Sequence, residues 1–594
     1  MAESRLFLAG LAGLTLLGAF PALAAPQLRA QVRGDLPADL RIRIETAVGT
    51  TDRPARNRFD SRQRANAAAS EAAAVLRSEG YYAFSLQSGV SEDSRAEPFV
   101  EVTPGPQFRI QDVSIEWIDP APDPSIQALG RDQLRLTPGQ PVRAIDVVSA
   151  EGRVLAAIQK QGYADAFIGP REVIVDHADQ TLRPRFRINS GGPVRLGPVR
   201  LETDGRTRPA WLAGLSPWKP GAIYDPDAIA GLEKGLVESG AYDQVTVTLT
   251  PPEAAMEDGV RPVVVALTDR KPRRLEAGAS FSSSDGLGAD MRWSHFNQLG
   301  MADTSAVFGR ASTIDSRLGV QVTLPHWRRL RQSLNGYAAG YRRETSAYDE
   351  TGLEVRADIQ RRRSEVAYVT VGSALEYTQT REKSPSAAVV LRREQVIGSV
   401  LGALAFDSTD NVLNPTTGWR VDIRAEPTLI AGSVTLSYVK ASIQGSAYLP
   451  LGPEQATVLA VRARTGAILG GTLSGVPASR RFYAGGGGSV RGYVFQGIGP
   501  HLADDTPVGG LSLVEVSGEV RHRLSDRWGL VAFADAGSVG RYQEPAFDGL
   551  NIGAGLGVRY DLGFGPIRFD LAFPLNRRSG DPGYQVYVSI GQSF

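Results

Sequence analysis

Two patterns of hydrophobic and polar residues divide the chain, and the change between them falls near residue 271. From residue 274 to the end, apolar and polar residues alternate in short segments, as at Leu275, Ala277, Ala279 and Phe281. Alternation with a period of two is typical of strands that have one apolar face. At about 20 residues for each strand and its connection, this part has room for about sixteen antiparallel strands, as in a transmembrane β-barrel.

The part before residue 271 instead repeats one α+β unit three times. Helical segments end in a glycine followed closely by a tyrosine at 76–81, 158–163 and 236–242. The three glycines are 82 and 78 residues apart, and a nearly fixed period is typical of repeated domains. We expect each glycine to end its helix in the left-handed conformation and each tyrosine to open the next strand. Each repeat is then a strand, helices and two further strands.

The first 24 residues have the features of a cleavable signal peptide. Arg5 supplies a positive charge, residues 6–17 form an apolar core, and residues 22–24 form a small-residue cleavage site. The apolar core is shorter than the roughly 20 residues that a membrane-spanning helix needs. No run of 18 apolar residues follows it in the sequence. We therefore expect the chain to leave the cytoplasm and to cross a membrane only with strands.

Composition argues against several classes of protein. The chain has 65 basic and 64 acidic residues, a net charge of +1, which disfavours nucleic-acid binding through a basic surface. It has no cysteine, and therefore no disulfide framework, thiolate nucleophile or cysteine metal site. The histidines are scattered without the neighbours of a metal site or a catalytic triad: His177, His295, His326, His501 and His522. We expect no catalytic residue, no metal and no cofactor.

The last segment alternates and ends on an aromatic residue. Its two faces carry, on one side, Tyr584, Val586, Val588 and Ile590 and, on the other, Gln585, Tyr587, Ser589 and Gly591, before the terminal Phe594. This ending resembles the C-terminal signal of bacterial outer-membrane barrels. We expect a lateral seam where this last strand, including Gly591 and Phe594, meets the first strand from Leu275 to Phe281. Gly591, which lacks a side chain, is a candidate weak point in that pairing.

A glycine-rich loop near residues 480–500 carries one arginine that needs an explanation. Residues 485–488 are four glycines, and Arg491 follows them directly before Gly492 and Tyr493. Arg491 is either a chance residue on a flexible surface loop or the guanidinium of a loop that folds into the protein and meets a fixed carboxylate. The run lacks the Lys-Ser/Thr pair of a phosphate-binding loop.

Three motifs resemble the BamA/TamA superfamily of outer-membrane translocases. Residues 407–418 match its D-x-x-D-N…P-T-x-G turn, residues 490–493 match its V-R-G-[FY] loop, and residues 533–537 match its F-x-D-x-G strand motif. The N-terminal repeats resemble the POTRA domains of the same superfamily, with their L-x-x-x-G-Y helix ends. The resemblance covers nearly all of the chain that follows the signal peptide.

The resemblance implies a site inside the barrel. In that superfamily the loop arginine folds into the lumen and meets the aspartate of the strand motif, which are Arg491 and Asp535 here. Alternation places Phe533 and Asp535 on one face, and we expect Phe533 to pack against the loop. Gly492 would let the loop pass close to the wall, Gly537 completes the strand motif, and Tyr493 would fill the remaining space. We expect this pair to be the only strong tether of the loop.

The resemblance also implies domains and function. We expect POTRA domains at 25–106, 107–192 and 193–270 in the periplasm, followed by an outer-membrane barrel at 271–594. Three POTRA domains and this length resemble the TamA branch of the superfamily. That branch would imply assembly of unfolded outer-membrane or autotransporter clients through the lateral seam, within the lipid bilayer, with a TamB-like partner anchored in the inner membrane. The alternatives are a two-partner-secretion-like transporter and a passive solute channel.

Overall fold

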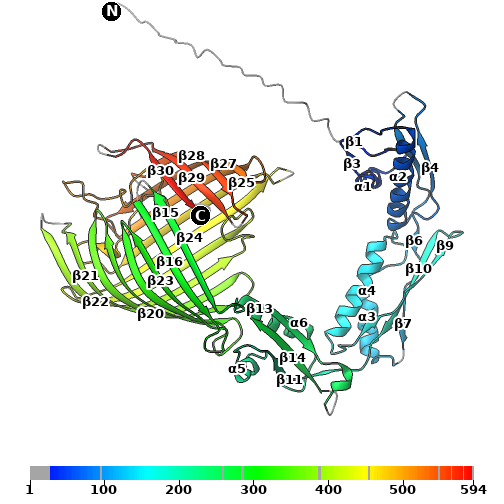
Figure 1. The fold of residues 1–594 in the computed structure, drawn as a ribbon, viewed down its shortest axis with the longest axis horizontal. Coiled ribbons are helices and arrows are strands. Elements are labelled where there is room, and N and C mark those ends of the chain that lie inside the picture. Colours follow the sequence, from blue (N-terminus) through cyan, green and yellow to red (C-terminus); the bar gives the residue numbers. More distant parts are fainter. Residues whose placement is uncertain are drawn as a thin grey trace, which may run out of the picture. The chain divides into compact units, whose positions relative to one another are not determined.

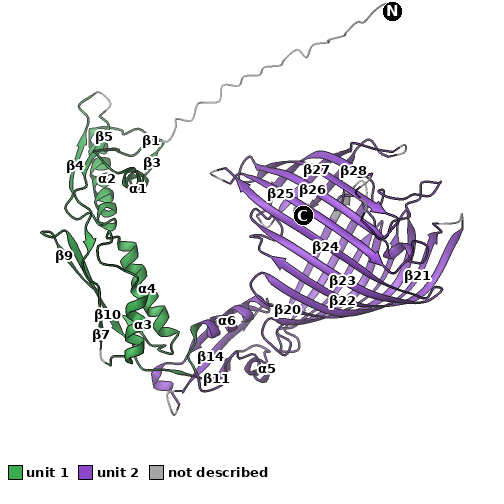
Figure 2. Ribbon diagram, turned by 180° about the vertical axis from the view of Figure 1, so that it is seen from behind, with its two compact units in different colours: residues 1–195, 223–226 green, residues 196–222, 227–594 purple. Residues whose placement is uncertain are grey.

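The computed structural model describes residues 27–590 except 94–95, 119, 257–259, 283–285, 386–388, 453–454, 546, 548, 564 and 579–580. The signal peptide and the seam positions Gly591 and Phe594 therefore lie outside the described residues. The chain forms two compact units, residues 1–195 with 223–226 and residues 196–222 with 227–594 (Figure 2). Within the described residues, no helix combines the length and apolar character needed to span a membrane.

The first α/β repeat packs two helices on a small sheet. Its elements are β1 (Gln27–Leu28), β2 (Gln31–Arg33), α1 (Ala38–Val48), β3 (Thr50–Thr51), α2 (Arg58–Ser78), β4 (Ser85–Val90) and β5 (Pro98–Thr103). The main sheet has the order β2-β5-β4, and β1 pairs with β3. Ile44 and Leu76 from the helices pack on Val100 and Val102 of β5, all of them buried.

The second repeat is organised around one central strand. Its elements are β6 (Arg109–Ile110), β7 (Ser114–Ile118), α3 (Pro124–Leu134), α4 (Ala144–Gln159), β8 (Phe167–Ile168), β9 (Glu172–Asp176) and β10 (Thr181–Asn189). Strand β10 pairs with all four other strands, and its Phe186 and Ile188 bury against Val154 and Ile158 of α4.

The third repeat has a four-stranded sheet of order β12-β11-β14-β13. Its elements are β11 (Arg195–Glu202), α5 (Pro209–Gly214), β12 (Ala222–Ile223), α6 (Pro226–Glu238), β13 (Tyr242–Leu249), the 3-10 helix η1 (Pro252–Ala254) and β14 (Val260–Asp269). Gly80, Gly162 and Gly240 have φ of +84°, +101° and +68°, so all three helix ends turn through the left-handed region as expected.

A closed antiparallel barrel of sixteen strands, β15 to β30, follows, and β30 lies beside β15 (Figure 1). The strands are β15 (Arg273–Ser282), β16 (Gly286–Phe296), β17 (Thr304–Ser312), β18 (Asp315–Leu324), β19 (Gln332–Glu344), β20 (Tyr348–Arg362), β21 (Ala367–Lys383), β22 (Val390–Asp407), β23 (Gly418–Gly432), β24 (Leu436–Leu451), β25 (Thr457–Leu469), β26 (Ser512–Arg523), β27 (Trp528–Gly540), β28 (Asn551–Asp561), β29 (Pro566–Pro574) and β30 (Gln585–Ile590). On β20, Leu353 and Val355 are exposed whereas Glu350 and Glu354 are buried. This alternation gives an apolar outer face and a polar interior.

The seam between β15 and β30 has little pairing within the described residues. The register pairs across it are Phe281 with Val588 and Ser282 with Tyr587. By contrast, β15 pairs with β16 along its whole length, so that Leu275, Ala277 and Ala279 face β16 residues. On the other side, Val586 and Ile590 of β30 pair with β29, and Tyr584 precedes β30. The seam is the least paired junction of the barrel's described strands.

The third repeat is joined to the barrel by buried polar contacts. In the turn after β16, the Asn297 side chain donates to Thr207 Oγ1 at 3.1 Å and to the Asp269 carboxylate at 3.1 and 3.2 Å. In the turn after β18, His326 Nδ1 accepts from the backbone N–H of Arg331 at 3.1 Å. The ring is therefore neutral with a proton on Nε2, which donates to the Gly235 carbonyl of α6 at 2.8 Å.

Acidification should weaken this junction through His326. Burial lowers the pKa of His326 below its ordinary value of 6.5, although the Gly235 carbonyl and Glu238 act in the opposite direction. A lowered folded-state pKa means that the neutral ring stabilises the junction above pH 6.5 and that this contribution is lost as the pH falls through the folded-state value. We expect the unfolding temperature in detergent to fall more steeply below pH 6.5 for the native chain than for His326→Gln.

His522→Gln is the matched control, because His522 is an exposed histidine in the same barrel. It should retain the full pH dependence of the native chain. Equal pH dependence of the native chain and His326→Gln would contradict this role of His326.

Candidate functional site

The lumen loop, residues 470–511, connects β25 to β26 and lies inside the barrel. Its apolar residues Val476, Phe482, Val490, Tyr493 and Ile498 are buried in one cluster with wall residues from six strands. Those wall residues are Ile397, Ile430, Tyr438, Ile468, Leu513 and Val539. The loop is thus a packed part of the barrel interior and not a free surface segment.

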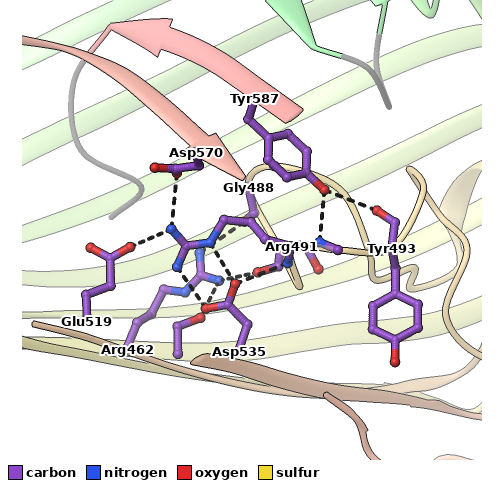
Figure 3. A network of polar contacts seen from close by, with 12 residues as sticks. Arg462, Gly488, Arg491, Tyr493, Glu519, Asp535, Asp570 and Tyr587 are labelled. Atoms are coloured by element: carbon purple, nitrogen blue, oxygen red, sulfur yellow. Dashed lines mark hydrogen bonds and ion pairs between the residues drawn. The ribbon is translucent and has the colours of Figure 1, made fainter. Parts of the chain in front are cut away.

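Arg491 of the lumen loop meets Asp535 of β27 in a bidentate ion pair (Figure 3). Arg491 Nε lies 2.7 Å from Asp535 Oδ2 and Nη2 lies 2.9 Å from Oδ1. The Arg491 backbone N–H also donates to Oδ2 at 3.1 Å. The guanidinium carbon lies 3.4 Å from the centre of the Phe533 ring, which adds a cation–π contact. The structure thus brings together the two charged residues and the aromatic residue that the motifs singled out.

Two further carboxylates face the same guanidinium. Arg491 Nη1 lies 2.7 Å from Glu519 Oε1 of β26 and 3.3 Å from Asp570 Oδ2 of β29. The side chains of all these charged groups are almost completely withdrawn from water. The two added carboxylates are shared with wall arginines, namely Arg521, Arg559 and Arg568. Arg491 therefore completes a buried network in which most charges have several partners.

Close backbone approach explains the glycines at this site. Gly492 has φ of +98°, and a Cβ there would lie 2.9 Å from the carbonyl carbon of Phe573. A Cβ on Gly553 of β28 would lie 1.8 Å from the Arg491 carbonyl oxygen. At Gly537 it would lie 2.8 Å from a methyl group of Val490. The lumen loop can reach Asp535 only because these positions carry no side chain.

The rest of the motif is held by side chains that are distant in sequence (Figure 3). The buried Tyr493 donates its hydroxyl to Asn576 Oδ1 at 2.7 Å. Arg462 of β25 donates to the carbonyls of Gly488 and Ser489 at 3.0 and 3.1 Å. Tyr587 of β30 accepts from the Gly492 backbone N–H at 3.1 Å.

A second anchor holds the other end of the lumen loop, so the expectation of a single tether is wrong. Arg480 makes a bidentate pair with Glu376 of β21, with N–O distances of 2.6 and 3.1 Å. Arg481 lies 3.5 Å from Glu382, which also accepts from the Ala478 backbone N–H and pairs with Arg393 at 2.7 Å. The site predicted from the sequence did not include this anchor, although the two adjacent arginines before the glycine run were a usable signal.

The described residues contain no group of three or more His, Cys, Asp or Glu side chains arranged to hold a metal ion.

The fold and the interior define a class of protein: a β-barrel with an apolar outer face, N-terminal α/β repeats and a lumen loop fixed by buried arginines. Residues 297–594 match the Omp85 superfamily domain, and the chain belongs to that superfamily.

The chain is similar to known proteins over most of its length. The outer-membrane protein assembly factor BamA of Neisseria meningitidis is 23% identical, over 87% of this chain and 71% of that protein. The structure of BamA from Haemophilus ducreyi lacking POTRA domains 1–3 has a TM-score of 0.65 at 18% identity and covers 81% of this chain and 99% of that one. CdiB from Acinetobacter baumannii has a TM-score of 0.48 at 14% identity, covering 84% of this chain and 90% of that one.

Membership of the superfamily places the chain in the bacterial outer membrane, with its N-terminal POTRA domains in the periplasm. Proteins of this superfamily are transporters and assembly factors rather than enzymes. The chain is accordingly an outer-membrane protein of the Omp85 superfamily.

Proposed function

We propose that this protein inserts or secretes outer-membrane clients, including autotransporter-type proteins, through the seam between β15 and β30. The observation that carries the proposal is the sparse pairing of that seam, where the described register pairs are Phe281 with Val588 and Ser282 with Tyr587. In an antiparallel ladder every second register pair exchanges backbone hydrogen bonds, so the junction with the fewest described pairs costs the least to open. The BamA relative is by its name an assembly factor, which supports the same function.

An open seam would give a client strand a template within the membrane. The edge of β15 would offer unpaired backbone N–H and C=O groups, and a client strand could pair with them irrespective of its sequence. Such pairing keeps every backbone polar group satisfied while the client passes into lipid. The opening needs no covalent chemistry and no cofactor.

The N-terminal repeats would receive clients before they reach the seam. We assign POTRA domains to 25–106, 107–192 and 193–270, each of which holds a helix pair on its own sheet. Three such domains favour the TamA branch, which would imply a TamB-like partner anchored in the inner membrane. The contacts of Asn297 and His326 with the third repeat would transmit its position to the barrel.

The lumen loop would keep the barrel interior closed to solutes while the seam opens for a client. Its two anchors hold it against β21 on one side and against β27 on the other. A loop fixed in this way inside the barrel argues against a passive solute channel.

A disulfide across the seam tests the proposed function. The chain has no cysteine, so Phe281→Cys with Val588→Cys, which are register partners, introduces the only two thiols. We expect oxidation to block client assembly and reduction to restore it. Cysteines at Ala279 and Tyr587 would suit this test less well. Both residues lie on the seam strands, but they are not register partners, because Tyr587 pairs with Ser282.

The matched control is Ala279→Cys with Ala289→Cys, register partners on β15 and β16 that leave the seam free. Assembly should continue when this control pair is oxidised. Full assembly by the oxidised seam pair would overturn the proposed function.

A further inference from the structure

Tyr587 belongs both to the seam and to the lumen loop. It lies on β30, where its register partner across the seam is Ser282. Its side chain is 1% exposed and packs with Val531, Phe533 and Ala572 on the inner face of the wall. Its hydroxyl accepts from the Gly492 backbone N–H at 3.1 Å and donates to the Tyr493 carbonyl at 3.3 Å (Figure 3).

We propose that the Tyr587 hydroxyl couples the lumen loop to the seam, so that release of the loop and opening of the seam favour each other. This inference rests on the proposed function, because it concerns how the seam is kept closed. Arg491 is fixed to β26, β27 and β29, and the next two residues of the loop hold Tyr587. The network therefore holds β30 from inside the barrel at Tyr587, which is one of the β30 residues that pair with β15.

The coupling follows from the contacts that would have to break. If β30 moves away from β15 at Ser282, the backbone of Tyr587 moves with it and carries the hydroxyl away from Gly492 and Tyr493. Both groups are buried, so they would lose hydrogen bonds that water does not replace while the loop stays in place. Release of the loop removes that penalty. Coupling of this kind is reciprocal, so a closed seam must also stabilise the loop.

A cavity next to Tyr587 provides space for the movement. Its volume is about 390 Å³, and its lining includes Gly487 and Gly488 of the lumen loop, Arg568 of the wall, and Tyr587 with Ser589 of β30. The ring already packs closely against the loop on this side, since a Cβ on Gly487 would lie 2.8 Å from Tyr587 Cδ1. A Cβ on Gly488 would meet no atom within 4 Å. The Tyr587 ring therefore packs on the loop at Gly487 and has open space beside it.

The first test removes the hydroxyl alone. In the background of Phe281→Cys with Val588→Cys, Tyr587→Phe should slow disulfide formation across the seam about fivefold, the effect of one net hydrogen bond. Limited trypsin digestion should cut the lumen loop faster by a similar factor, with the fragments identified by mass. Tyr584→Phe is the matched control, because Tyr584 is an exposed tyrosine just before β30. It should leave both rates unchanged.

The second test keeps the hydroxyl and displaces the ring. Gly487→Ala should accelerate loop cleavage and slow seam oxidation, whereas Gly488→Ala should do neither. Heat-modifiable migration in gels checks that every variant forms a folded barrel. If Tyr587→Phe and Gly487→Ala both match the native chain in both rates, the coupling is wrong.

The third test distinguishes coupling from two independent weak points. In an Arg491→Ala background, oxidation of the seam pair should protect the lumen loop from trypsin when Tyr587 is present and should fail to protect it in Tyr587→Phe. Equal protection with and without the hydroxyl would overturn the proposal. These readouts do not use client assembly, so an oxidised seam that still assembles clients would reject the proposed function and leave the coupling standing.

Discussion

Arg491→Ala should release the second half of the lumen loop and abolish most client assembly. The substitution leaves Asp535, whose side chain is completely buried, with only the backbone N–H of residue 491 as a described partner. An uncompensated buried charge costs about 3–5 kcal/mol, which is a large fraction of the total stability of a typical domain. Trypsin digestion of the loop and assembly of an autotransporter client are the two measurements.

Asp535→Ala should be milder than Arg491→Ala. Without Asp535, the guanidinium still faces Glu519 at 2.7 Å and Asp570 at 3.3 Å and still stacks on Phe533. The double variant should resemble Arg491→Ala, because the residues act as one network and their effects are not additive. Arg491→Lys is the control that keeps the charge but loses the bidentate geometry. Additive effects of the two alanine substitutions would contradict a direct contact between Arg491 and Asp535.

The sequence predicted the barrel well because its signal is local. Alternation along each strand needs no distant partner, and the sixteen strands expected from length and pattern are the sixteen strands found. The helix ends at Gly80, Gly162 and Gly240 are equally local, since glycine favours the left-handed turn that each of them makes.

The contacts of the site were harder to predict because they depend on register. Glu519 and Asp570 reach Arg491 only because β26, β27, β28 and β29 pair in the order and register that they do. Motif resemblance could pair Arg491 with Asp535, but nothing in the spacing pointed to these two further acids. One signal was available: Glu515, Glu519 and Arg521 alternate with valines on β26, as expected for a strand with one polar face toward the lumen.

The contacts at the other end of the lumen loop were hard to predict from the sequence for the same reason. Glu376 and Glu382 lie on β21, about a hundred positions before the arginines that they meet. The alternation of β21 marks both glutamates as inward-facing, yet no local pattern assigns them to Arg480 and Arg481. Only the folded structure shows that the first half of the loop is fixed to β21 and the second half to β27.

Glu382→Ala should loosen the first half of the lumen loop without releasing it. Glu382 is fully buried and is shared by Arg393 and Arg481, whose side chains are 5% and 1% exposed. Its removal leaves two buried guanidinium groups without their carboxylate, again at a cost of about 3–5 kcal/mol. Arg480 still pairs with Glu376, so we expect only a partial displacement and a small rise in single-channel conductance across a planar bilayer.

Combining Glu382→Ala with Arg491→Ala should have a much larger effect on conductance than the two single variants together. Each anchor alone can hold the lumen loop inside the barrel, because the loop is tied to β21 at one end and to β27 at the other. The double variant removes the Arg491 network and both ion pairs of Glu382, and of the two described anchors it leaves the Arg480–Glu376 pair, so the interior should open to ions. Asp349→Ala, which removes an exposed carboxylate of β20, is the control and should conduct like the native chain. A double variant that conducts no more than Arg491→Ala would show that the Glu382 contacts do not hold the loop.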